Sequence, residues 1–401
     1  MISPRLLGVA RSAAWIAAIQ AVNFLVPLAA VPFILGGLGV EGFSRYAVLM
    51  ACIGFFVVFA DFSFNVTGPI RARAALAEGR LGGLLGDSLL LKAGLMLPAS
   101  VAFLAVAGTG ADGVLALAHA AALALTPRWL VYSLGRLGAF ALLSAASRLG
   151  WLAVVVAGAA GDLAWLLAAS AVAQAVTMAG CFALVGCRPG RFGARGPVRI
   201  LREDIGQFGA ILAAGGGREL TVLILAALAA PAEVAGYALA DRVRVLMVGL
   251  VAPVTQALFL AIVEGGGRES GFRGPASLLV LVAAAGGGAL VFAAAGPLVA
   301  ALGGGELPQA VAALRVLCLL PFLTGLTAIL GANTLLAEGR GGAYAASQIV
   351  VALLGLPLAA LAIAGGGAVG AAWAAVATEA ALAAGFALAL RRAGLTARVL
   401  R

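Results

Sequence analysis

Residues 13–36 read AAWIAAIQAVNFLVPLAAVPFILG, a run without a single acidic or basic side chain. A helix of about 20 apolar residues is long enough to cross the hydrocarbon core of a bilayer. The run follows Arg5 and Arg11 and is much longer than the apolar part of a cleaved signal peptide. We therefore expect it to remain in the protein as the first membrane span.

The rest of the chain has the same character. Its 401 residues are 63% hydrophobic and 10% charged, whereas soluble domains carry about 25% charged residues. This composition excludes a water-soluble fold and predicts an all-α integral membrane protein, because a spanning helix satisfies its own backbone hydrogen bonds. Division at charged or Gly/Pro-rich breaks predicts twelve spans, at residues 13–36, 44–64, 88–107, 113–130, 137–159, 163–186, 208–229, 235–263, 278–295, 311–336, 344–364 and 369–390.

The basic residues predict the orientation of these spans. Lys and Arg are retained on the cytoplasmic side of a membrane. The odd-numbered connections hold Arg45 as their only basic residue, so both termini are predicted to be cytoplasmic. The termini and the even-numbered connections hold the other Arg outside the spans, among them Arg71, Arg73, Arg80, Arg128, Arg136, Arg188, Arg191, Arg195, Arg199, Arg202, Arg391 and Arg392.

The longest connection, at residues 187–206, is predicted to be a cytoplasmic, Arg-rich linker between two lobes. A six-helix N-terminal lobe would cover residues 1–186 and a six-helix C-terminal lobe residues 207–401. A weak internal repeat supports this division, because Arg45-Tyr46-Ala47 opens the second span and Gly236-Tyr237-Ala238 opens the eighth. A parallel duplication of six helices would produce such a pair.

Several function classes find no support in the sequence. The net charge of +10 comes from scattered Arg rather than from a basic and aromatic face, so we expect membrane lipids and no nucleic acid as neighbours. The four cysteines lack metal-ligand spacing, and the chain has no HExxH, P-loop or GxSxG motif. The external connections are too short for a catalytic domain. We therefore expect a transporter with no cofactor rather than an enzyme.

Charged residues inside the predicted spans are the candidate functional groups. Each costs about 2.5 to 3.5 kcal/mol near a helix centre, so a chain retains them only where they are paired or needed. The bases are Lys92, Arg148, Arg218, Arg242, Arg244 and Arg315, and the acids are Asp61, Glu219, Asp241 and Glu379.

Local neutralisation explains part of this set. Asp241 and Arg244 are three residues apart and can pair on one helix face, and Lys92 is near enough to a helix end to extend toward the interface. Arg218 and Glu219 are adjacent and point about 100° apart, so pairing explains them poorly. Because bases outnumber acids, we predict a positive, water-filled cavity. Guanidinium groups bind phosphate oxygens in a bidentate manner, which favours a pyrophosphate-bearing substrate.

The remaining polar residues leave alternatives open. Asn23 and Asn65 can hydrogen-bond either a sugar or a neighbouring helix. Asp61 and Asp241 either neutralise nearby bases or bind a coupling ion, Na⁺ or H⁺. His119 is either a proton relay or a histidine buried in an apolar helix.

Residues 20–74 carry a series of features that continues along the chain. They are Gln20, Asn23, Val26-Pro27-Leu28, Val31-Pro32-Phe33, Leu38-Gly39, Phe43, Asp61-Phe62-Ser63-Phe64-Asn65 and Arg71, then Pro127 with Trp129, Ala235-Gly236-Tyr237, Ala240-Asp241-Arg242, and Leu330-Gly331-Ala332-Asn333 with Leu336. Together they resemble the Wzx-type polysaccharide and O-antigen flippases of the MOP exporter superfamily. Arg242 stands where that family commonly has lysine, and Ser63 stands where it commonly has glycine.

The resemblance implies a MATE-like fold with two six-helix lobes around a central cationic cavity, and alternating access. It implies a multi-pass protein of the bacterial cytoplasmic (inner) membrane that moves an undecaprenyl-pyrophosphate-linked oligosaccharide for surface polysaccharide biosynthesis, beside a glycan polymerase and glycosyltransferases. The residues expected to bind this cargo in the cavity are Arg218, Arg242, Arg244, Arg315, Arg148, Lys92, Asn23 and Asn65.

Two alternatives stay open. Multidrug or cation antiporters of the same superfamily share the two-lobe plan, but cationic drugs need buried acids, and bases outnumber acids here. A membrane glycan polymerase or ligase would handle the same lipid-linked sugars, but it would need an external catalytic loop that these short connections do not provide.

Overall fold

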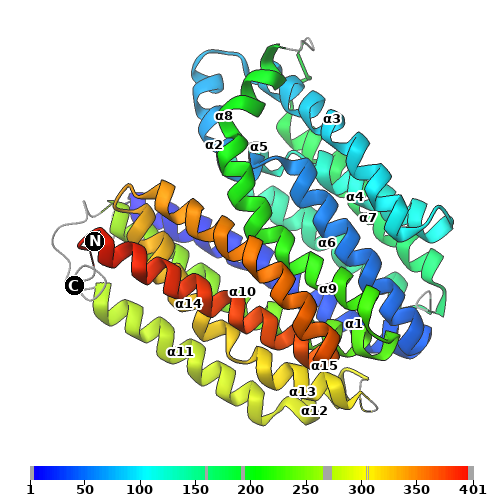
Figure 1. The fold of residues 1–401 in the computed structure, drawn as a ribbon. Coiled ribbons are helices and arrows are strands. Elements are labelled where there is room, and N and C mark those ends of the chain that lie inside the picture. Colours follow the sequence, from blue (N-terminus) through cyan, green and yellow to red (C-terminus); the bar gives the residue numbers. More distant parts are fainter. Residues whose placement is uncertain are drawn as a thin grey trace. The chain divides into compact units, whose positions relative to one another are not determined.

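The computed structural model describes residues 4–158, 161–190, 195–264, 273–303, 305 and 307–395. Across these residues the chain is helical almost throughout and has no β-strand, which confirms the all-α class (Figure 1). Seven helices of the described part are long and apolar enough to cross a membrane, or eight if one bent pair forms a single span. The protein is therefore a multi-pass membrane protein.

A single broken helix contains the first two predicted spans. Helix α1, Pro4–Asp61, is interrupted at Gly39, where φ is 67° and ψ is −176°. Glycine adopts a positive φ at little cost because it has no Cβ. The predicted spans at residues 13–36 and 44–64 therefore lie on either side of this break.

Of the helices that follow α1, α3, α6 and α7 each cover most of a predicted span, whereas α2 corresponds to none and the span predicted at residues 113–130 is divided between α4 and α5, so the count of twelve spans stays a prediction. Arg148 lies inside α6 as expected. Asp162 accepts hydrogen bonds from the backbone of Ala164 and Trp165, which caps the start of α7. The helices are α2 (Phe64–Ala77), α3 (Leu81–Ala107), α4 (Ala111–Leu125), α5 (Arg128–Ser133), α6 (Leu137–Val156) and α7 (Leu163–Val185).

The predicted linker at residues 187–206 contains part of a helix, α8, Arg195–Ile211. A π-helical segment, η2 (Leu212–Gly216), follows it and leads into α9 (Gly217–Leu228). The next helices are α10 (Pro231–Glu264), α11 (Arg273–Ala293), α12 (Ala295–Ala301), α13 (Pro308–Leu317) and α14 (Leu320–Leu330).

The chain ends in a second broken helix. The π-helical segment η3 (Gly331–Leu336) extends α14, and α15 (Gly341–Arg392) then contains the last two predicted spans. Gly367, with φ of 52°, separates these spans as Gly39 does in α1. The side-chain carboxylate of Glu233 accepts a 2.7 Å hydrogen bond from the backbone of Ala368, which holds the break from α10.

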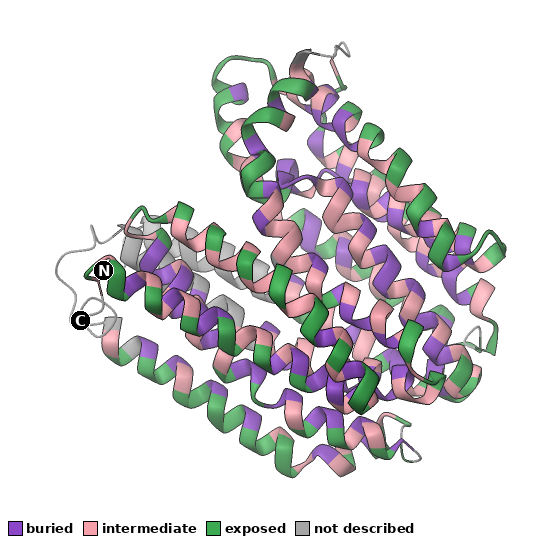
Figure 2. Cartoon of the chain, in the orientation of Figure 1, coloured by how far each residue is buried: buried purple, intermediate pink, exposed green. Residues whose placement is uncertain are grey.

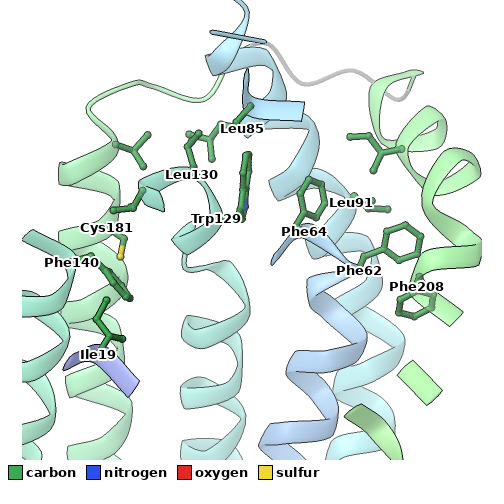
Figure 3. Packing of buried hydrophobic residues seen from close by; sticks show 14 of the residues in the cluster. Ile19, Phe62, Phe64, Leu85, Leu91, Trp129, Leu130, Phe140, Cys181 and Phe208 are labelled. Atoms are coloured by element: carbon green, nitrogen blue, oxygen red, sulfur yellow. The ribbon is translucent and has the colours of Figure 1, made fainter. Parts of the chain in front are cut away.

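The chain divides into two compact units. The first unit is Met1–Val26 with Gly36–Leu220, and the second unit is Pro27–Leu35 with Thr221–Arg401. The first unit has a large apolar core in which Phe62 stacks on Phe208, with ring centres 4.5 Å apart (Figure 3). In the second unit, Tyr344 stacks on Phe386 at 5.1 Å.

Exposed residues lie along several helices (Figure 2), and many of them have large apolar side chains. Leu97 and Val101 on α3 are each 73% exposed, and Leu290 on α11 and Leu361 on α15 are similarly exposed. Soluble monomers rarely expose continuous apolar surface of this kind. Contact with lipid chains accounts for it.

Candidate functional site

Lys92 forms the centre of a polar cluster inside the first unit. This residue on α3 is only 1% exposed. Its Nζ donates to Oδ1 of Asp61 at 2.7 Å and to the carbonyl oxygen of Ala124 at 2.9 Å. Its ammonium group also lies 5.5 Å from the centre of the Phe64 ring. Lys92 is thus neutralised where it is buried, and the expectation that it extends toward a helix end was wrong, because Asp61 supplies a nearer partner.

The other oxygen of Asp61 is also occupied. Its Oδ2 accepts from Nδ2 of Asn65 at 2.7 Å and from the Asn65 backbone at 3.1 Å. The structure therefore brings together the predicted site residues Lys92, Asp61 and Asn65. Asn65 is exposed and held in place by Asp61, whose two carboxylate oxygens both carry hydrogen bonds.

The chain between these groups has an uncommon backbone conformation. Phe62 and Ser63 separate α1 from α2 and have φ of 44° and 67°. A left-handed conformation costs a non-glycine residue about 1 to 2 kcal/mol. Both residues are buried, and the stacking of Phe62 on Phe208 helps to hold the break (Figure 3). Strained backbone that persists in this way is concentrated at functional sites.

A second polar cluster fixes α8 to the first unit, and the sequence analysis missed it. Asp204 on α8 is 7% exposed. It accepts from Oγ1 of Thr67 at 2.9 Å and from Nη2 of Arg71 at 2.8 Å. Nη2 of Arg71 also donates to Glu203 at 2.8 Å. We call these four residues the α2–α8 latch. The available signal was that Glu203 and Asp204 are the only acids in an Arg-rich linker.

Arg218 and Glu219 form an ion pair, although their adjacent positions argued against one. Nε of Arg218 donates to Oε1 of Glu219 at 3.1 Å, and its Nη2 also contacts this oxygen. The long Arg side chain reaches across the angle between the two positions. Glu219 is 9% exposed and rests on Gly54, where a Cβ would lie 2.6 Å from Cδ of Glu219. The pair belongs to the first unit, which extends to Leu220.

The second unit holds three more of the predicted bases, Arg242, Arg244 and Arg315. The expected pair on α10 is confirmed, because Nε of Arg244 lies 2.5 Å from Oδ1 of Asp241. Arg242 is half-buried on the same helix. On α13, the exposed guanidinium of Arg315 lies 5.6 Å from the centre of the Phe292 ring, in cation–π contact.

Three further candidate residues lie in the first unit. Asn23 has a buried Oδ1 for which the described residues provide no hydrogen-bond donor. On α6, Arg148 is half-buried and acts electrostatically on His119 of α4. Nδ1 of His119 lies 3.0 Å from Oγ of Ser170 on α7. Nothing in these contacts joins Asn23 or Arg148 to the cluster around Lys92, so their role in a common cavity stays a prediction.

Metal binding has no visible basis in the described part of the chain. No group of three or more His, Cys, Asp or Glu side chains comes together there.

Comparison with known proteins identifies the fold. No protein-family model matches the sequence. No curated protein matches it either. An inward-facing multidrug resistance transporter of the MATE family, in the MOP superfamily, aligns with a TM-score of 0.65 and 17% identity, over 94% of this chain and 95% of that one.

Two other solved structures are also similar to this chain. A MOP superfamily transporter from Pyrococcus furiosus aligns with a TM-score of 0.61 and 15% identity, over 96% of this chain and 95% of that one. The lipid II flippase MurJ, in an inward closed conformation, aligns with a TM-score of 0.58 and 10% identity, over 96% of this chain and 87% of that one. This chain therefore has the fold of the MOP-superfamily transporters.

Proposed function

We propose that this protein is a flippase that translocates an undecaprenyl-pyrophosphate-linked oligosaccharide across the bacterial cytoplasmic membrane for surface polysaccharide biosynthesis. The two lobes would alternate in access around a central cationic cavity. Solved structures with this fold include both multidrug transporters and a lipid II flippase. The fold therefore leaves the cargo open, and the chemistry of the charged residues has to decide it.

The balance of charge inside the spans is the observation that supports an anionic cargo. Asp61, Glu219 and Asp241 are each bound to a base. Arg242 and Arg315 have no carboxylate partner among the described residues. The charge that remains for a ligand is positive. Guanidinium groups match the paired oxygens of a pyrophosphate and stay charged at any accessible pH.

We assign roles to the predicted residues on this basis. Arg218, Arg242, Arg244 and Arg315 would hold the pyrophosphate, with Arg148 adding positive charge. Asn23 and Asn65 would hydrogen-bond sugar hydroxyls. Lys92 is too deeply buried to touch the cargo, so we infer that it positions Asn65 through Asp61.

The two alternative functions, an antiporter for organic cations and a glycan polymerase or ligase, are less well supported. An organic cation needs a carboxylate that is not already neutralised, and three of the acids in the spans are paired with bases. A glycan polymerase or ligase would need an additional catalytic site. The neighbours in fold named above are transporters and a flippase.

Reconstitution tests the proposed function directly. Purified protein in proteoliposomes should move a fluorescent undecaprenyl-pyrophosphate oligosaccharide between leaflets, measured by its accessibility to a membrane-impermeant quencher. Arg242→Ala and Arg315→Ala should each lower the rate at least about tenfold, the effect of losing about 1.4 kcal/mol of interaction. Arg80→Ala is the matched control, because Arg80 is an exposed residue between α2 and α3 that pairs with Glu78.

Other outcomes would redirect the assignment. Wild-type rates in both Ala variants would contradict a role for these guanidinium groups. Cation-driven efflux of organic cations from vesicles would establish the antiporter instead. Polymerisation of lipid-linked repeats by the purified protein would establish the enzyme.

A further inference from the structure

Helices α2 and α8 both belong to the first unit, where the α2–α8 latch joins them. Each helix has one face that packs inside the unit. On α8 this face is formed by Ile200, Asp204 and Phe208, which are buried and recur every four residues. The buried residues of α2 are Phe64, Gly68, Ala72 and Ala75. The opposite faces of the two helices are therefore directed out of the unit.

These outer faces combine large apolar side chains with Arg. On α8, Val198 is 44% exposed and Ile205 is 54% exposed, and the exposed Arg202 lies between them. Their spacing of four and three residues places all three on one helix face. On α2, Ile70 is 72% exposed, and Arg73 follows it three residues later and is also exposed. We define the α2–α8 outer patch as Val66, Ile70, Arg73, Val198, Arg199, Arg202 and Ile205.

The α2–α8 outer patch is positively charged. Glu203 is the exposed acid on these two helices, and it pairs with Arg71 at 2.8 Å and lies 4.0 Å from Arg199. The ion pairs of the described residues include none for Arg73 or Arg202. Their guanidinium groups are therefore available to an anion outside the chain.

Neither water nor hydrocarbon suits this combination of side chains. Large apolar side chains gain free energy when they leave water, whereas a guanidinium group is costly in the hydrocarbon core of a bilayer. The boundary between acyl chains and headgroups satisfies both, as it does for basic amphipathic helices that lie at a membrane surface. There the apolar side chains reach the acyl chains, and the long Arg side chains extend to the phosphates.

The position of the patch in the fold also favours lipid as its occupant. Helix α2 follows α1 directly, and α8 packs against α3. Both α1 and α3 are long and apolar enough to cross a membrane. The outer faces of α2 and α8 thus continue from helices whose surroundings are lipid.

We propose that the α2–α8 outer patch is a binding site for the headgroups of anionic phospholipids. Arg73, Arg199 and Arg202 hold the phosphate oxygens, because guanidinium groups bind them in a bidentate manner. Ile70 and Ile205 lie among the acyl chains of the same lipids. The excess of Arg over acid makes the patch prefer anionic to zwitterionic headgroups. The site is independent of the cargo and of the proposed flippase function.

Native mass spectrometry of the purified, detergent-solubilised protein measures this preference. Dioleoylphosphatidylglycerol is titrated as the anionic lipid and dioleoylphosphatidylcholine as the zwitterionic lipid. The variant Arg73→Gln/Arg199→Gln/Arg202→Gln should bind the anionic lipid at least about tenfold more weakly than wild type, and the zwitterionic lipid with little change. All three side chains are exposed, so their replacement should leave the fold intact.

The matched control is a triple variant with the same change of charge outside the patch. Arg80→Gln/Arg391→Gln/Arg392→Gln replaces three exposed Arg and should keep the wild-type preference for the anionic lipid. An equal loss of binding in both triple variants would overturn the proposal, because it would show a general attraction between a basic protein and anionic lipid. Wild-type binding by the patch variant would overturn it as well.

A spin label distinguishes lipid from a soluble occupant of the same patch. A nitroxide at Ile205→Cys in the Cys187→Ser protein, reconstituted into phosphatidylglycerol vesicles, should be more accessible to oxygen, which concentrates in acyl chains, than to a water-soluble nickel chelate. The remaining cysteines are buried and should not be labelled. Thr109→Cys, at an exposed position between α3 and α4, should show the opposite preference.

The two measurements also separate this site from the transport function. If the label at Ile205→Cys is accessible mainly to the chelate, the patch faces water, where a soluble acidic partner could bind, and the lipid site is rejected. A protein that shows the expected lipid binding and label accessibility but moves no glycan would reject the flippase function and leave the lipid site standing.

Discussion

At the scale of single residues, Ser63 shows how one backbone angle can be tested. Its φ of 67° lies in the left-handed region, which favours glycine. Ser63→Gly should remove about 1 to 2 kcal/mol of strain, offset by about 0.5 to 1 kcal/mol of added freedom in the unfolded chain. We expect a small rise in the melting temperature of the detergent-solubilised protein.

The matched control is the same substitution at a buried serine inside a helix. Ser88 on α3 is 1% exposed. Ser88→Gly should lower the melting temperature, because glycine inside a helix costs about 1 kcal/mol. Equal shifts in the two variants would show that backbone strain at Ser63 contributes nothing measurable.

The second prediction at this scale concerns the role of Arg218 in transport. Arg218→Ala should abolish glycan translocation, and Arg218→Lys should keep part of it, because a point charge replaces a bidentate donor. Arg218→Ala also removes a base from the buried carboxylate of Glu219. The double variant Arg218→Ala/Glu219→Gln separates the two effects, since it should fold like wild type and still not transport. Transport by the double variant would remove Arg218 from the site.

Residue spacing explains which of these contacts the sequence could predict. Asp241 and Arg244 are three positions apart on one helix, so their pairing follows from helix geometry alone. Lys92 and Asp61 come from different helices, as do Arg71 and Asp204. No local pattern specifies such pairs, because they depend on how the helices pack.

At the scale of elements, we predict that the α2–α8 latch stabilises the folded protein. Arg71 and Asp204 are largely buried, with side chains 20% and 10% exposed. Asp204→Ala leaves the Arg71 charge without this partner and should destabilise the protein by about 3 kcal/mol. Arg199→Ala is the control, because its pair with Glu203 is exposed and 4.0 Å long, and it should cost less than about 0.5 kcal/mol. Thermal unfolding of the two variants measures the difference, and equal melting temperatures would contradict the latch.

The same scale shows where prediction of the fold succeeded and where it failed. Apolar runs predicted twelve spans, whereas the described part of the chain has seven helices that are long and apolar enough to cross a membrane, or eight with the bent pair. Gly39 and Gly367 mark breaks that lie between predicted spans. Helix α8 was not predicted, because a segment with so many Arg residues is typical of a loop. Burial of Ile200 and Phe208 helps to stabilise this helix, and that burial depends on how the helices pack. The π-helical segments η2 and η3 have no local sequence signal that distinguishes them from an ordinary helix.

At the scale of the whole molecule, the distribution of Arg predicts that both termini are cytoplasmic, and this can be tested in intact cells. The connection between α2 and α3 is predicted to be cytoplasmic and contains Glu78, whose side chain is 47% exposed. The connection between α3 and α4 is predicted to be external and contains the exposed Thr109. A membrane-impermeant maleimide should therefore label Thr109→Cys in intact cells, and Glu78→Cys only after the cells are permeabilised. Cys187→Ser is a suitable parent protein for both variants, because the other cysteines are buried and should not react.

The physical reason for the expected labelling is the retention of Lys and Arg on the cytoplasmic side, which acts on the short connections of this chain. Labelling of Glu78→Cys in intact cells, with Thr109→Cys protected, would invert the topology and would place the Arg-rich residues 187–206 outside the cell, away from the leaflet where a lipid-linked cargo is made.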